Sequence, residues 1–181
     1  MLDVMLDLET MGNGPDAAIV AIGAVGMDLR NGTLGKDFYA TISLESSVEA
    51  GGQMDPSTVL WWMRQSSAAR DELVAGDGKE SEVVFRFYEF LKNNSDFDTL
   101  RVWGNGVDFD NVIMESALRR HRLDIPWRYR NNSCYRTVRK LFPDVGMVIR
   151  EGTLHNAYDD ARNQALHLIK IFSEKSLIPS L

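Results

Sequence analysis

The spacing of apolar residues predicts a group of strands at the start of the chain. Residues 2–8 form a short apolar run, and residues 18–27 form a second run that is rich in Val, Ile and Ala. Residues 36–43 alternate between apolar and polar positions, as a half-buried strand does. Short connections rich in Gly, Asn and Asp separate the runs, so we expect an antiparallel meander of three strands.

After these runs the apolar spacing changes to that of helices. Asp55 followed by Pro56 is typical of an N-cap and the first helical position. A brief strand is predicted over residues 100–103, and further helices over residues 80–93, 110–122, 133–142 and 156–173. This order predicts an α/β fold in one domain, residues 1–181, with a central mixed sheet flanked by helices.

Composition places the chain among single-domain proteins without membrane spans. Its 181 residues are 44% hydrophobic and 25% charged, enough for a core and a polar surface. The longest apolar runs are too short to cross a bilayer, and the first nine residues carry three acids, unlike a secretory signal. A single cysteine excludes an internal disulfide, and one cysteine with three scattered histidines argues against structural zinc. We therefore expect a cytoplasmic protein with no membrane partner.

The net charge of −6 is unevenly distributed. Residues 115–140 carry eight basic and two acidic side chains, a net +6 against −12 for the remainder. A basic segment beside an acidic remainder suits a protein that grips a phosphate backbone and also holds divalent cations. On charge alone, the simpler explanation of this basic segment is a solvated helical face.

The first candidate for chemistry is Asp7-Leu8-Glu9-Thr10, at the end of the first predicted strand. Side chains alternate along a strand, so Asp7 and Glu9 point to one side and Leu8 to the other. Adjacent carboxylates on an apolar strand repel each other and lose hydration, and a bound divalent cation removes both costs. A strand end that runs into solvent accounts for the isolated motif equally well.

Two further segments place acids at the starts of helices. Between Trp103 and Asp110, two glycines permit a tight turn into a helix. Asp108 can act as an N-cap, which leaves Asp110 aimed across the end of the sheet. Near the last helix, His155 precedes Asp160 by little more than one turn, so the two side chains can converge. Taken alone, that pair is explained by a cap or a surface hydrogen bond.

The three segments together resemble the DEDD exonuclease superfamily, which is DnaQ-like and has a ribonuclease H-like fold with a five-stranded mixed sheet. Histidine five residues before the last aspartate matches the DEDDh variant. The alternative variant needs tyrosine at position 156, where this chain has Asn156. The chain looks most similar to small phage- and prophage-type exonucleases, including T4-like exonuclease A, the exodeoxyribonuclease VIII type and a mycobacterial 3′→5′ exoribonuclease domain.

The resemblance implies a metal-dependent 3′→5′ exonuclease. It assigns His155 as the general base that takes a proton from the attacking water. Two divalent cations, Mg²⁺ or Mn²⁺, would be held by four carboxylates: Asp7, Glu9, Asp110 and Asp160. The substrate would be a single-stranded 3′ end of DNA or RNA, with DNA slightly favoured, and the product a nucleoside 5′-monophosphate. A homodimer is possible, since relatives form dimers.

The same resemblance also suggests which residues contact the substrate. Backbone groups of Thr10 and Met11 would hold the terminal sugar, and Trp61 or its neighbour would stack on the terminal base. Adjacent tryptophans cannot face one direction on a helix, so one is expected in the core. Asn105 and Phe109 are further candidates for substrate contact. Many relatives have His-Asn where this chain has Asn105 and a glycine.

Several other functions remain open from the sequence. The same mechanism serves an exoribonuclease. A non-catalytic nucleic-acid-binding module on this fold would be expected to have lost at least one of the five catalytic positions, and all five are present. A structural or adaptor protein would use the acids only as helix caps. A hydrolase of small phosphoesters would share the metal site and differ only in substrate.

Overall fold

A five-stranded mixed sheet forms the centre of the molecule in a computed structural model, which describes residues 2–177. The strands are β1 (Asp3–Thr10), β2 (Ile19–Asp28), β3 (Thr33–Thr41), β4 (Arg101–Gly104) and β5 (Asn132–Cys134), in the spatial order β3-β2-β1-β4-β5. The first three strands pair antiparallel, whereas β4 runs parallel to β1 and β5 parallel to β4. The predicted meander and the mixed sheet are both confirmed.

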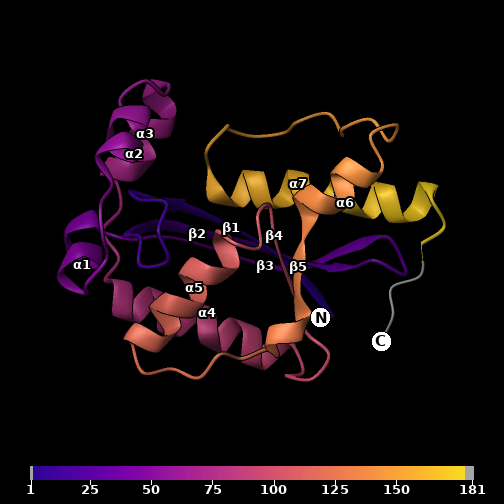
Figure 1. Ribbon diagram of the computed structural model, residues 1–181, viewed down its shortest axis with the longest axis horizontal. Coiled ribbons are helices and arrows are strands. Elements are labelled where there is room, and N and C mark those ends of the chain that lie inside the picture. The colour runs from indigo at the N-terminus through magenta and orange to yellow at the C-terminus, as the bar shows by residue number, and fades with distance from the viewer. Residues whose placement is uncertain (1, 178–181) are drawn as a thin grey trace.

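Helices cover both faces of the sheet (Figure 1). They are α1 (Leu44–Glu49), α2 (Pro56–Trp62), α3 (Ser67–Val74), α4 (Glu80–Asn94), α5 (Asp110–Arg120), α6 (Tyr135–Leu141) and α7 (Ala157–Glu174), with a 3₁₀ turn, η1 (Tyr129–Asn131). Helices α4 and α5 lie against one face, and α6 and α7 against the other; α2 and α3 stand beside one end of the sheet (Figure 1). Within the described residues, no helix is long and apolar enough to span a membrane.

The alternation along β1 decides which way its acids point. Val4, Leu6 and Leu8 join the apolar cluster under α4 and α5. Met5 faces the opposite way and packs in the cluster beneath α7. Asp7 has the parity of Met5, so its carboxylate lies on the α7 side. This side is opposite Leu6 and Leu8, as the sequence predicted.

A glycine in β2 lets the start of α7 approach the sheet. Gly23 pairs with Asp7 across the antiparallel ladder. A Cβ at Gly23 would lie 2.1 Å from the carbonyl carbon of Ala157 and 2.4 Å from the backbone nitrogen of Tyr158. Because no side chain intervenes, the first turn of α7 lies directly over the strand that carries Asp7. The same approach brings Asp160, in that first turn, close to the end of β1.

Several boundaries differ from the sequence prediction. The helix predicted over residues 133–142 begins at Tyr135, because Asn132–Cys134 form strand β5 instead. The side chain of Asn132 explains why this polar segment is held at the edge. Its Oδ1 accepts from Trp127 Nε1 and Asn111 Nδ2, both at 2.8 Å. Trp127 lies five residues before Asn132 and Asn111 lies 21 residues before it, and neither spacing is a strand period, so no local pattern predicts the strand.

The remaining differences are at helices and strand ends. Helices α1 and α3 were not predicted, because they are short, six and eight residues long, and have a weak apolar stripe. The third strand covers Thr33–Thr41 rather than residues 36–43. The predicted N-cap of α2 is confirmed, because Asp55 Oδ1 accepts from the backbone N–H groups of Ser57 and Thr58.

We predict that Gly23→Ala destabilises the fold. The added methyl group must push α7 away from the sheet, and such overpacking costs about 1–3 kcal/mol in the free energy of unfolding. Urea unfolding measures this loss, with Gly35→Ala as the matched control, since a Cβ there meets its nearest atoms at an ordinary 3.5 Å. Equal unfolding midpoints for the two variants would mean that α7 does not depend on this close approach.

Candidate active site

Three chain segments meet at the carboxyl end of β1. Asp7 and Glu9 come from β1, and Asp110 is the first residue of α5. His155 lies in the loop before α7, and Asp160 lies in the first turn of that helix. Glu9, His155 and Asp160 each offer a ligand atom, and these atoms lie within 4.8 Å of one another. The structure therefore brings together all five residues predicted to carry the chemistry.

Asp7 lies at the centre of this group and is 9% exposed. Its Oδ1 accepts a hydrogen bond of 2.7 Å from Gln164 Nε2, one turn after Asp160 on α7. Burial raises the pKa of Asp7 well above its ordinary value, and the charges of Asp110, Glu9 and Asp160 raise it further. The Gln164 hydrogen bond partly opposes that rise.

Asp110 lies on the other side of Asp7 and is 2% exposed. Its carboxylate accepts from the backbone N–H of Leu8 at 3.1 Å and of Gly106 at 3.4 Å, which fixes it across the end of β1. Burial raises the pKa of Asp110 to about 7 in spite of these hydrogen bonds. Asp108 is exposed, and the N-cap of α5 is Phe109, so the N-cap explanation of Asp108 is not supported.

His155 and Asp160 are linked through the backbone that enters α7. His155 has a positive φ of 65°, and its backbone N–H donates to Asp160 Oδ2 at 3.2 Å. Asn156 caps the helix, since its side chain accepts from the backbone N–H of Asp159 at 2.9 Å. Asp159 turns away and accepts from the Thr153 backbone at 2.7 Å. The two neighbouring aspartates thus have separate partners, as their angular separation on a helix predicted.

The imidazole of His155 lies among aromatic rings. Its centroid is 4.8 Å from the Trp61 ring and 6.0 Å from the Trp62 ring, both edge to face. Burial lowers the pKa of His155 below its ordinary value, Asp160 opposes that change, and Arg150 adds to it. A neutral imidazole beside carboxylates can accept a proton from a nearby water.

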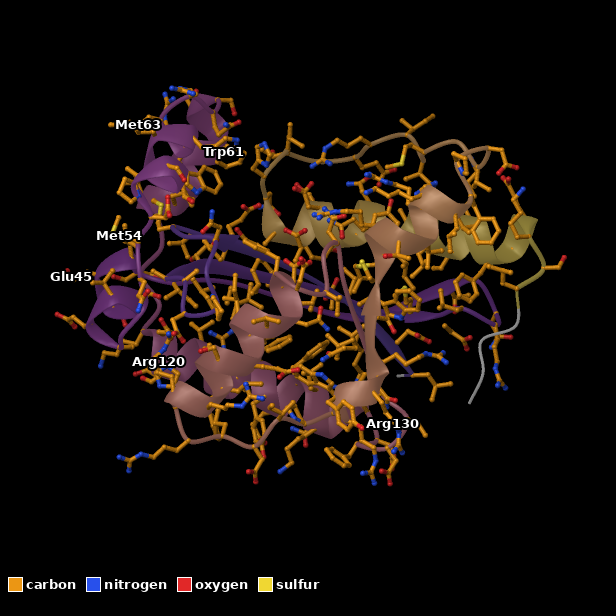
Figure 2. The ribbon with its side chains drawn as sticks, in the orientation of Figure 1. Glu45, Met54, Trp61, Met63, Arg120 and Arg130 are labelled. Carbon is orange, nitrogen blue, oxygen red and sulfur yellow. The ribbon has the colours of Figure 1, made fainter. Side chains whose placement is uncertain are left out.

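One of the two adjacent tryptophans is in the core and the other is partly exposed, as the sequence predicted. Trp62 is 3% exposed, and its Nε1 donates to the Thr10 carbonyl at 2.9 Å. Trp61 is 41% exposed. Figure 2 shows Trp61 on the side of α2 that faces the start of α7, with Met63 on the outer side. Trp61 is therefore the tryptophan available to a ligand.

Two pockets adjoin the carboxylates. One, of about 250 Å³, is lined by Thr10, Trp61 and Phe109 together with Glu9. The other, of about 360 Å³, is lined by Asn105, Arg139 and Arg150 together with Asp7, Glu9, His155 and Asp160. Glu9 borders both pockets. We call the first the aromatic pocket and the second, where Arg139 and Arg150 lie beside three of the carboxylates, the basic pocket.

Met11 is separate from both of these pockets. It lines an apolar pocket behind Trp62, of about 410 Å³. Its backbone N–H donates to Ala18, and its carbonyl accepts from Asp55, each at 2.8 Å. The other four residues predicted to contact substrate border the acids: Thr10, Trp61, Asn105 and Phe109.

The basic segment of residues 115–140 is divided by the fold. Arg120 forms a 2.6 Å ion pair with buried Glu80, and Arg119 and Arg128 pair with Glu115 and Asp98. Figure 2 shows Arg120 and Arg130 on the α4–α5 side of the molecule, away from α7. Of this segment, Arg139 reaches the basic pocket. Most basic residues of the segment thus lie on the surface, as expected if the segment is solvated and does not bind nucleic acid.

Sequence reasoning missed two residues of the site. Gln164 follows Asp160 by four residues, so helical spacing places both on one face and could have identified it. Arg150 lies in an irregular loop and donates from Nη2 to Asp160 Oδ1. No periodic pattern in the sequence points to that contact.

Comparisons with known proteins identify a family and similar chains. Residues 2–172 match the family described as the 3′-5′ exoribonuclease Rv2179c-like domain. The chain is 26% identical over 129 residues to an exodeoxyribonuclease of Enterobacteria phage T4, covering 66% of this chain and 56% of that protein. The chain therefore spans little more than half the length of this curated relative.

Two solved structures share the fold. The zinc-bound form of an E. coli ExoI–ssDNA complex superposes with a TM-score of 0.69 and 16% identity, covering 97% of this chain and 41% of that one. The nuclease domain of 3′hExo, a DEDDh family member bound to rAMP, gives a TM-score of 0.60 and 13% identity, covering 95% of this chain and 92% of that one. With the family match over residues 2–172, the chain belongs to the 3′-5′ exoribonuclease Rv2179c-like domain family.

Proposed function

We propose that this chain is a metal-dependent 3′→5′ exonuclease that degrades single-stranded nucleic acid to nucleoside 5′-monophosphates. The observation that carries the proposal is the meeting of Glu9, His155 and Asp160 within 4.8 Å, beside the buried carboxylates of Asp7 and Asp110. Membership of a 3′→5′ exonuclease family supports the same reaction. Removal from a 3′ end is the direction that the family description names.

The donor set fits divalent cations. Asp7 and Asp110 are both nearly inaccessible to water, and burial raises the pKa of each. Asp7 also experiences the charges of three other carboxylates. Such a group is costly to keep ionised unless cations compensate it, and carboxylate oxygens suit Mg²⁺ or Mn²⁺.

Four carboxylates would hold two such ions: Asp7, Glu9, Asp110 and Asp160. When bound, the ions would supply an activated water and would stabilise the leaving oxygen of the phosphodiester. The protein's contribution is to hold the carboxylate oxygens in fixed positions. Leu8 and Gly106 hold Asp110 through backbone N–H groups, and Gln164 holds Asp7. This fixed arrangement lowers the reorganisation needed when substrate arrives.

His155 would act as general base. Its lowered pKa keeps the imidazole neutral near pH 7, so it can accept a proton from the attacking water. Trp61 packs edge to face against the ring, which restrains its position beside Glu9 and Asp160. The proton leaves the water as its oxygen attacks phosphorus, and the 3′ oxygen of the preceding nucleotide departs.

The aromatic pocket is the best place for the terminal nucleoside. It is lined by Thr10, Trp61 and Phe109, and it adjoins Glu9. Stacking of a base on an aromatic side chain contributes about 1–3 kcal/mol. At about 250 Å³ the pocket suits a single nucleoside, so a paired 3′ end has to fray before it enters. These points favour single-stranded substrates.

DNA is slightly favoured over RNA, and an exoribonuclease is the second candidate. The phage T4 relative is an exodeoxyribonuclease, whereas the family description names an exoribonuclease. The difference depends on contacts to the 2′-hydroxyl group. A non-catalytic binding module or an adaptor that uses the acids as caps would show no turnover. A Mn²⁺ titration followed by calorimetry separates the adaptor, because caps do not bind metal.

We predict that the metal-free protein loses stability as the pH rises from about 4 towards 7. The folded pKa of Asp7 is raised, and that of Asp110 is raised to about 7, above an unfolded value of about 3.9. The folded state therefore binds these protons more tightly than the unfolded state does. The resulting stabilisation is complete at pH values below the unfolded pKa and is lost as the pH rises through the folded pKa. Melting temperatures measured in a chelator between pH 4 and 7 test this prediction, and a melting temperature that rises with pH would contradict it.

Asp7→Asn should weaken that pH dependence, raise the metal-free melting temperature at pH 8 and abolish cleavage. The amide removes the charge that Asp110, Glu9 and Asp160 repel. Asp108→Asn is the control, because Asp108 is exposed and lies outside both pockets. A clear loss of metal-free stability in Asp7→Asn would show that this carboxylate has a structural role instead.

We predict that His155→Ala reduces turnover about 10²–10⁴-fold, the usual effect of losing a general base. Mn²⁺ affinity, measured by calorimetry, should change little. The wild-type rate should rise with pH as the imidazole loses its proton, and the rise should be centred below the ordinary histidine pKa of about 6.5, since burial lowers the pKa of His155. A flat profile, or loss of Mn²⁺ binding in the variant, would give His155 a different role.

We predict that single-stranded DNA is degraded fastest, with single-stranded RNA close behind and blunt duplex slowest. Initial rates on 5′-labelled substrates of one sequence, at one salt concentration, provide the test. A blunt duplex degraded fastest would overturn the single-strand proposal. A tenfold preference for RNA, about 1.4 kcal/mol in transition-state binding, would favour the exoribonuclease. Turnover of small phosphoesters alone would indicate a different hydrolase.

A further inference from the structure

The basic pocket contains an arginine that the proposed mechanism does not use. Arg150, from the loop between α6 and α7, forms an ion pair with Asp160, one of the proposed metal ligands. The same nitrogen, Nη2, donates to the Thr153 carbonyl at 2.9 Å, which links the guanidinium to its own loop. The Arg150 side chain is 37% exposed. Arg150 therefore lies at the edge of the carboxylate cluster and is partly open to solvent.

The contact places Arg150 in competition with a cation. Asp160 Oδ1 accepts from Arg150, and Asp160 Oδ2 accepts the His155 backbone N–H at 3.2 Å. A cation bound to Asp160 would compete for Oδ1 and weaken its attraction for the guanidinium. Within the described residues, both hydrogen bonds of Arg150 come from Nη2, so Nε and Nη1 are free to donate elsewhere.

The surroundings indicate which group Arg150 would bind next. Arg150 and Arg139 both line the 360 Å³ pocket that also contains Asp7, Glu9 and His155. Arg139 comes from α6 and lies over the Tyr135 ring, 5.8 Å from its centroid. A phosphate held at the acids would thus face two guanidinium groups. Guanidinium matches phosphate oxygens with paired, charge-assisted hydrogen bonds.

We propose that Arg150 is a phosphate-binding residue that rests on Asp160 in the metal-free protein and transfers to a phosphate oxygen of the nucleotide once a divalent cation occupies that carboxylate. This inference rests on the proposed function, because the phosphate is that of its substrate or product. No bond is made or broken; one hydrogen-bond acceptor replaces another. Arg150 thereby couples metal loading to nucleotide binding.

The test uses Arg150→Gln and Arg150→Lys, with Arg162→Gln as the matched control. Arg162 lies on α7 and pairs with Glu151 of the same loop at 3.3 Å, so it reports on loss of a loop contact alone. Two readouts are independent of turnover: calorimetric affinity for Mn²⁺, and affinity for thymidine 5′-monophosphate compared with thymidine in Ca²⁺. Thermal unfolding of each variant checks that it remains folded.

We expect Arg150→Gln to bind Mn²⁺ more tightly than the wild type, because a competitor for Asp160 is gone. It should bind thymidine 5′-monophosphate about tenfold or more weakly, as loss of a charge-assisted hydrogen bond predicts, and thymidine equally well. Arg150→Lys should recover part of the monophosphate affinity. Arg162→Gln should match the wild type in every assay.

The outcomes separate this inference from the proposed function. Wild-type affinities for both Mn²⁺ and the monophosphate in Arg150→Gln would make Arg150 a loop anchor only and overturn the inference, while leaving the exonuclease proposal intact. Equal loss of thymidine and monophosphate affinity would also overturn it, since the change would not be specific to phosphate. Failure of the wild type to bind Mn²⁺ would overturn both proposals. Binding as expected without turnover would overturn the exonuclease proposal alone.

Discussion

The structure is organised around the burial of like-charged carboxylates at the end of β1. Asp7 and Asp110 are almost inaccessible to solvent, and burial raises the pKa of both. A buried carboxylate without compensation costs several kcal/mol, so its surroundings have to supply donors. Here Leu8 and Gly106 contribute backbone N–H groups to Asp110, and Gln164 contributes an amide to Asp7. These fixed donors hold the oxygens in place and leave net negative charge for a cation to neutralise.

Close packing is what allows the acids to converge. Gly23 has no side chain, so the first turn of α7 lies directly on the sheet opposite Asp7. The positive φ of His155 and the Asn156 cap then direct the loop back toward the end of β1. On the far side, Trp62 anchors α2 to Thr10 and leaves Trp61 beside the imidazole. Residues from four separate segments thus share one edge of the sheet.

The two pockets beside the acids differ in a way that matches the two parts of a nucleotide. Aromatic side chains, including Trp61 and Phe109, line one pocket and suit a base and sugar. Arg139 and Arg150 line the other and suit phosphate. Glu9 borders both pockets. The negative charge of the whole chain therefore says little about its partner, because a phosphate at this site would meet Arg139 and Arg150 beside carboxylates that the proposed cations would neutralise.

The sequence by itself predicted the meander and the division between a buried and a partly exposed tryptophan, because these follow from short-range periodicity. The five residues that meet at the site were predicted from the resemblance of three motifs to a known superfamily, since each motif alone has a simpler explanation. The sequence did not determine strand β5, whose position depends on pairing with β4 and on the hydrogen bond between Asn132 and Asn111, 21 residues earlier. Nor did it place Met11 behind Trp62 or set Arg150 against Asp160. Those contacts follow no local period, because they depend on the path of an irregular loop and on packing between elements, so only the tertiary structure could decide them.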